Sequence, residues 1–178
     1  MRTLSIALLT FFAGFAVAAD PVYMDREGKP LPPAAELAKL TGDAAKGATL
    51  MALCSTCHVI NGAGMDFGPD LSDVGARKTK EQIIESILNP SAVIEPGYEM
   101  VMLKLKSGET AAGMIGSEND EEVVVKMMGG AKTTHKVADI ESRTKQTMSV
   151  MPPGLQATMT KDDLVNLVEY LFSLKAKK

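Results

Sequence analysis

The hydrophobic positions of the chain change their period twice, from helical spacing to alternation and back to helical spacing. Before residue 58, small or apolar residues recur every three or four positions, at Ala44, Gly47, Leu50, Met51 and Cys54. A helix is therefore predicted to begin near Thr41 or Asp43, either of which can cap its free amides, and to end at Cys54–His58.

Two further helices are predicted from the same spacing. One begins at Thr79, where Gln82 completes a capping box, and ends at Asn89-Pro90, because the residue before a proline avoids helical backbone angles. The other follows Thr160 and directs one apolar face inward, formed by Leu164, Leu167, Val168, Leu171 and Phe172. A glycine-rich segment from residue 59 to 75 separates the first two helices and is predicted to be a loop.

Between the second and the last helix, polar and apolar residues alternate, as in strands with one buried face. Strands are predicted at residues 99–106, 110–115, 122–128 and 132–137. Antiparallel hairpins of this length form a small curled sheet or barrel. We therefore expect a mainly α domain, interrupted at residues 99–140 by a small antiparallel β insertion that precedes the loop to the last helix.

The first residues have the pattern of an export signal. Arg2 precedes an uncharged apolar stretch at residues 4–17, and Ala16-Val17-Ala18 offers the small residues that signal peptidase requires. The stretch is shorter than the roughly 20 residues that span a bilayer, so a cleaved signal peptide at 1–19 is favoured over an uncleaved anchor. A periplasmic location with no stable membrane span after cleavage is expected. The proline-spaced residues 20–40 are expected to form a flexible leader, with a strap packed across the domain as the alternative.

Composition and charge narrow the classes of function. Apolar residues make up 46% of the 178-residue chain, but aromatic residues only 4%, and tryptophan is absent. A porphyrin in the middle of the core would explain a core so poor in large rings. The formal net charge is −3 at pH 7, and no basic patch of the kind that binds nucleic acid is visible in the sequence. Nucleic acid is therefore not expected as a partner.

The segment Cys54-Ser55-Thr56-Cys57-His58 contains both cysteines of the chain. This spacing is typical of c-type haem attachment, because two thiols on one turn can each add to a vinyl group of one porphyrin while the next imidazole reaches the iron. A redox-active disulfide normally belongs to a strand–helix unit, and a zinc site needs two more soft ligands. We expect one covalent haem c on Cys54 and Cys57, with His58 as an axial ligand.

The second axial ligand must come from the opposite side of the ring, and the loop before the last helix is suitably placed. Met151 is the favoured candidate, because Pro152-Pro153-Gly154 restricts the backbone beside it. Met148, His135 and an open coordination site are the alternatives. A histidine–methionine pair would occupy both axial positions and leave electron transfer as the chemistry of the site.

Several segments resemble class I cytochromes c: Gly42–Gly47 before the haem motif, Gly68-Pro69-Asp70-Leu71, and Met151-Pro152 before the last helix. Longer runs are similar to the haem-binding domain of the planctomycete and verrucomicrobial type, at residues 68–99, 138–143 and 151–155. The resemblance extends over residues 41–174, which we interpret as the cytochrome c domain. A β insertion before the distal loop is typical of that subfamily.

The resemblance implies that His58 and Met151 are the axial ligands, and that the carbonyl oxygen of Pro69 accepts a hydrogen bond from the His58 ring. It also implies that Gly47 in the first helix lies against Tyr170 in the last.

Arg77 is a candidate partner for a haem propionate, with an exposed surface arginine as the alternative reading. The expected function is that of a carrier of single electrons, without catalytic residues, between a dehydrogenase and an oxidase or another cytochrome. An enzyme subunit or gas sensor with a displaceable distal ligand is the alternative. The β insertion is expected either to dock a partner or to be a structural filler.

Overall fold

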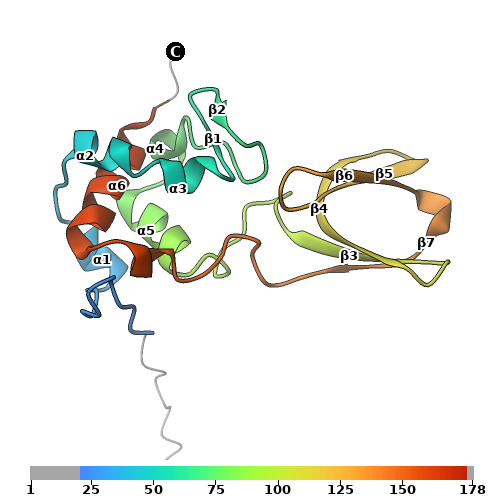
Figure 1. Ribbon diagram of the computed structural model, residues 1–178, viewed down its shortest axis with the longest axis horizontal. Coiled ribbons are helices and arrows are strands. Elements are labelled where there is room, and N and C mark those ends of the chain that lie inside the picture. Colours follow the sequence, from blue (N-terminus) through green and yellow to red (C-terminus); the bar gives the residue numbers. More distant parts are fainter. Residues whose placement is uncertain (1–20, 176–178) are drawn as a thin grey trace, which may run out of the picture.

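The computed structural model describes residues 21–175, so the predicted signal peptide lies outside the described part of the chain. The helices and the larger sheet form two lobes that lie side by side (Figure 1). The prediction of a mainly α fold is wrong: only 30% of the described residues are helical, and a five-stranded and a two-stranded antiparallel sheet are present. The helices are short, whereas the alternating segment forms a complete sheet with a hydrophobic core of its own.

The helical lobe contains six α-helices and one 3₁₀ helix among the described residues: α1 (Ala34–Leu37), α2 (Ala44–Thr49), α3 (Ala52–Ser55), α4 (Val74–Arg77), α5 (Lys80–Leu88), η2 (Leu155–Thr158) and α6 (Lys161–Ser173). The predicted capping box at Thr79 is confirmed, and a second one is present at Thr160; the two threonine side chains accept from the amides of Gln82 and Asp163. Asp43 caps α2. These caps determine where the three predicted helices begin.

The first predicted helix is divided into α2 and α3. At the division the backbone changes to the tighter i→i+3 pattern, in which the amide of Leu50 donates to the carbonyl of Gly47 and the amide of Leu53 to that of Leu50. Helix α2 crosses α6 at Gly47, where an added Cβ would lie 2.0 Å from the Asn166 carbonyl oxygen and 2.9 Å from Cβ of Tyr170. The predicted contact of Gly47 with Tyr170 is confirmed.

The segment that was expected to be a flexible leader packs in part on the helices. Leu31, Ala34 and Leu37 are buried in the main hydrophobic core, together with residues of α5 and α6. The amide of Arg26 also donates to the carbonyl oxygen of Met159, at 3.0 Å. Within the described residues this segment therefore follows the packed alternative rather than the flexible one, because its short apolar helix α1 has a face to bury.

The larger sheet is antiparallel, with the strand order β6-β5-β4-β3-β7. Its strands are β3 (Met100–Leu105), β4 (Thr110–Glu118), β5 (Glu122–Lys126), β6 (Lys132–Lys136) and β7 (Ile140–Lys145), with a 3₁₀ turn η1 (Val137–Asp139) before β7. The first four match the predicted strands, whereas β7 extends the sheet beyond residue 140. The buried side chains of the sheet form a small hydrophobic core of Val101, Leu103, Leu105, Val123 and Val125.

A short hairpin, β1 (Val59–Ile60) and β2 (Ala63–Gly64), follows the cysteine motif inside the segment predicted as loop. Within residues 21–175, no helix has the length and apolar character needed to cross a bilayer.

Candidate cofactor site

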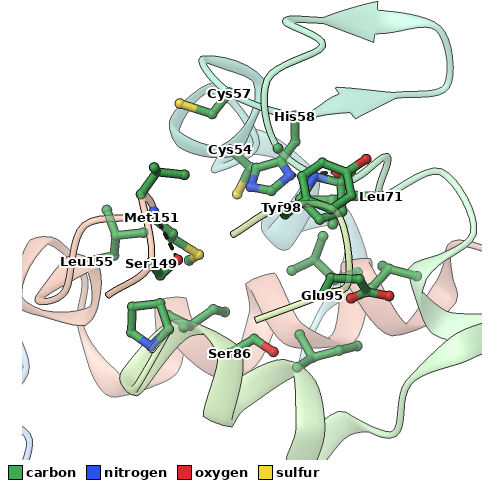
Figure 2. Close-up of a pocket in the computed structure, with 18 of the residues that line it drawn as sticks. Cys54, Cys57, His58, Leu71, Ser86, Glu95, Tyr98, Ser149, Met151 and Leu155 are labelled. Carbon is green, nitrogen blue, oxygen red and sulfur yellow. Dashed lines mark hydrogen bonds between the residues drawn. The ribbon is translucent and has the colours of Figure 1, made fainter. Parts of the chain in front are cut away.

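A cavity of about 290 Å³ lies in the helical lobe, and it is lined by all six predicted site residues, Cys54, Cys57, His58, Met151, Pro69 and Arg77. They enter from different parts of the chain, the first three from α3 and the turn after it and Met151 from the segment before η2 (Figure 2). Much of the remaining wall is apolar and includes Phe67, Leu71, Ile83, Ile87, Leu155 and Leu167. Such a cavity, apolar with a few polar groups, is suited to a flat hydrophobic ligand.

Both cysteines are free thiols, held on one turn by hydrogen bonds from the amides of Cys57 and His58 to the carbonyl oxygen of Cys54, at 3.0 and 2.9 Å. Burial raises the pKa of the Cys54 thiol to about 11. A cysteine that exchanges disulfides needs the opposite shift, toward the thiolate. The environment of Cys54 therefore argues against the disulfide-exchange alternative.

His58 is oriented by the loop that follows β2. Its Nδ1 lies 2.7 Å from the carbonyl oxygen of Pro69, which can only accept, so Nδ1 carries the proton and donates it. The lone pair of Nε2 is left free to bind a metal. Burial lowers the pKa of His58, and this effect exceeds the opposing effect of the Pro69 hydrogen bond. At neutral pH the imidazole is therefore neutral, as a metal ligand must be.

Gly68 completes the support of His58, and sequence reasoning missed it. A Cβ on Gly68 would lie 2.4 Å from Cε1 of the His58 ring, so only glycine lets the loop pack against the imidazole. The amide of Gly68 donates to the carbonyl oxygen of Cys57, at 2.6 Å. In the sequence, Gly68 belongs to the Gly68-Pro69-Asp70-Leu71 segment, but neither that segment nor a glycine before a proline indicates this contact with the imidazole.

The three candidates for the second axial ligand lie in different places. Met151 lines the cavity, and its amide donates to the Ser149 hydroxyl, at 3.1 Å (Figure 2). Met148 is 68% exposed and does not line the cavity. His135 is on β6, where its Nε2 is 3.0 Å from the hydroxyl of Thr133, also away from the cavity.

Arg77 lines one end of the cavity and is engaged by three acceptors. Its guanidinium donates to the carboxylates of Asp73 and Glu95, at 2.8 and 3.2 Å, and to the carbonyl oxygen of Asp70, at 2.6 Å. Lys78, which also lines the cavity, lies 3.2 Å from the second carboxylate oxygen of Glu95. This end of an otherwise apolar cavity is therefore charged, and it contains two cations.

The residues present fit a covalent haem. Two free thiols on one turn match the two vinyl groups of a porphyrin, and a neutral imidazole and a thioether are donors that iron accepts. The apolar walls match the ring, and the charged end of the cavity offers Arg77 and Lys78 to carboxylates, in exchange for the pairs that they make with Asp73 and Glu95.

Comparison with known proteins agrees with this geometry. The family model of cytochrome c matches residues 44–175, which is well over half of the chain. The chain therefore belongs to the cytochrome c family, and it binds haem c covalently and takes part in electron transfer with redox partner proteins. A search of curated proteins found no match to the chain.

Proposed function

We propose that this cytochrome c is a monohaem carrier of single electrons in the periplasm, with His58 and Met151 as the axial ligands of the iron. One observation carries the proposal: a neutral imidazole and a thioether line the same apolar cavity, beside two free thiols. When bound, haem supplies an iron that alternates between the ferric and ferrous states by one electron.

The residues of the chain hold the ring, orient its ligands and exclude water. Cys54 and Cys57 would hold it through thioether bonds, and the Pro69 carbonyl keeps His58 in the tautomer that leaves Nε2 free. The backbone of Met151 is held by its hydrogen bond to Ser149 and by the prolines that follow. If His58 and Met151 both bound the iron, no position would be open to a substrate, so this arrangement favours a carrier over an enzyme.

Further features support finer parts of the proposal. The segments at residues 68–99, 138–143 and 151–155 support membership of the planctomycete and verrucomicrobial subfamily. The signal pattern at residues 1–19 supports a periplasmic location. Arg77 is proposed as a propionate partner, because it lies at the charged end of the cavity. A dehydrogenase is proposed as the electron donor, and an oxidase or another cytochrome as the acceptor.

The test is the substitution Met151→Ala in haem-loaded protein, with Met148→Ala as the matched control. We expect Met151→Ala to abolish the ferric charge-transfer absorption band of the methionine–iron bond and to let the reduced protein bind carbon monoxide rapidly, since a coordination position opens. Met148→Ala should change neither property, because Met148 lies away from the cavity.

A Met151→Ala variant that keeps the band and the low-spin spectrum would show that the distal assignment is wrong. Rapid carbon monoxide binding by the unmodified reduced protein would instead favour the sensor or enzyme alternative.

A further inference from the structure

Lys126 connects the β sheet to the haem-attachment region. Lys126, the last residue of β5, donates from Nζ to the carbonyl oxygen of Asp66 at 2.7 Å and to its carboxylate at 3.0 Å. The Lys126 side chain is only 14% exposed, whereas that of Asp66 is 75% exposed. The turn that follows β5 also approaches this loop, since a Cβ on Gly130 would lie 3.8 Å from the sulfur of Met65.

The loop that Lys126 holds is bonded directly to the cysteine motif. The amide of Met65 donates to the carbonyl oxygen of Ser55 at 3.1 Å, and the amide of Phe67 to that of Cys57 at 3.1 Å. The amide of Gly68 shares the same Cys57 carbonyl, and Gly68 packs against the His58 ring. Residues 65–68 therefore lie between the sheet lobe and the haem-attachment segment, with contacts to both (Figure 1).

We propose that Lys126 is a positioning residue of the haem site. It holds loop 65–68 against the Cys54–His58 turn, so that the sheet is part of the frame that supports His58. The role of the sheet is then neither that of a filler nor that of a docking surface alone. For its effect on the haem, the proposal rests on the function proposed above, whereas the contact between the lobes is independent of it.

The strength of the contact depends on how far water competes for its hydrogen bonds. Hydrogen bonds from an ammonium group to a carboxylate and a carbonyl are stronger than neutral ones, and a surface pair gains little because water competes. The Lys126 side chain is largely shielded from that competition, whereas the Asp66 carboxylate is exposed to it. Loss of the contact should let loop 65–68 open more often and admit water on the His58 side of the ring. Water stabilises the more highly charged ferric state, so the reduction potential should fall.

The experiment compares Lys126→Met with Lys104→Met in the haem-loaded protein. Lys104 is on β3 of the same sheet and pairs with Glu141 on β7 at 2.9 Å, and both side chains are well exposed. In Lys126→Met we expect exchange of the Met65, Phe67 and Gly68 amides to be at least about tenfold faster, as loss of charge-assisted hydrogen bonds implies. The reduction potential should also fall. Lys104→Met should leave both quantities unchanged, and Lys126→Arg should restore most of the protection.

A second variant separates the effect of loop positioning on the reduction potential from the effect of charge alone. Asp66→Ala removes a negative charge, so a purely coulombic effect would move the potential in the direction opposite to that of Lys126→Met. Asp66→Ala keeps the backbone carbonyl to which Lys126 also donates, so release of the loop predicts a fall in both variants, smaller in Asp66→Ala, with faster exchange at the same amides. Opposite shifts with unchanged exchange would overturn the proposal, as would equal changes in Lys104→Met. Failure of the haem site itself would be distinguishable, because the unmodified protein would then lack the pigment or its methionine–iron band.

Discussion

The two lobes differ in how their cores are completed. The sheet encloses five buried aliphatic residues that fill its interior, so that β3 and β5 pack without any other component. The helical lobe has a larger buried core, but that core surrounds the cavity lined by the cysteine motif and Met151. Side chains alone thus fill the core of the sheet lobe, whereas the core of the helical lobe is built around a cofactor.

This difference has a thermodynamic consequence. An interior with an unfilled apolar cavity loses the contacts that its lining would otherwise make, and short helices have little stability outside a packed core. The helical lobe should therefore depend on haem for stability, and the sheet should not. The following predictions test that contrast, from the largest expected effect to the smallest.

Removal of both attachment thiols, by Cys54→Ala with Cys57→Ala, should unfold the helical lobe selectively. An unfilled cavity of about 290 Å³ corresponds to a loss of up to roughly 7 kcal/mol, which is comparable with the stability of a whole domain. Hydrogen exchange in the haem-free variant should show unprotected amides in α5 and α6 and protected amides in β3 to β5. Equal loss of protection in both lobes would mean that the sheet also depends on the cofactor.

Adding one methyl group should destabilise the helical lobe far more than the sheet. Gly47→Ala would place Cβ 2.0 Å from the Asn166 carbonyl and force α2 away from α6, at a cost of about 3 kcal/mol. Gly116→Ala in β4 is the matched control, because the nearest atom to its Cβ would be at 3.6 Å, an ordinary contact. Urea unfolding of the two haem-loaded variants measures the loss of stability caused by each substitution. Similar midpoints for the two variants would contradict the close helix crossing.

A smaller effect is expected from the ion pair between Lys80 and Glu169, at 2.6 Å, which joins α5 to α6. The hydrogen bond from Lys80, and then that from the Gly42 amide, lowers the pKa of Glu169 in the folded protein. Its contribution is therefore present above the ordinary carboxyl pKa and is lost as the pH falls through the lowered folded value. Glu169→Gln should cost about 1 kcal/mol at pH 7, since the pair is partly shielded from solvent.

The pH dependence and a sheet variant serve as controls for that prediction. The stability difference between the unmodified protein and Glu169→Gln should shrink as the pH is lowered, when the carboxylate becomes protonated in both states. Glu141→Gln, which removes the exposed partner of Lys104, should cost less than half as much at pH 7 because water screens that pair. If Glu169→Gln still lowers the free energy of unfolding at low pH, the effect comes from packing and not from charge.

Features that depend on neighbours in the sequence could be predicted. The helix starts at Thr79 and Thr160 follow from side chains that bond to amides three residues away, and the first four strands follow from alternation. Strand β7 escaped prediction because nearly all of its side chains are exposed, so its pattern lacks a buried face. The helical share was overestimated because the spacing before residue 58 does not reveal the division into α2 and α3.

The sequence by itself determined the haem-attachment motif, because Cys54, Cys57 and His58 lie within five residues and their spacing needs no tertiary contact. It also determined the residues at which the predicted helices begin, because a capping side chain bonds to amides only two or three residues away. Only the tertiary structure decided that Gly68 must lack a side chain, that Met151 and not Met148 lines the cavity, and that Lys126 bonds to Asp66. The physical reason is that these contacts join segments far apart in the chain, and their distances depend on how the lobes pack.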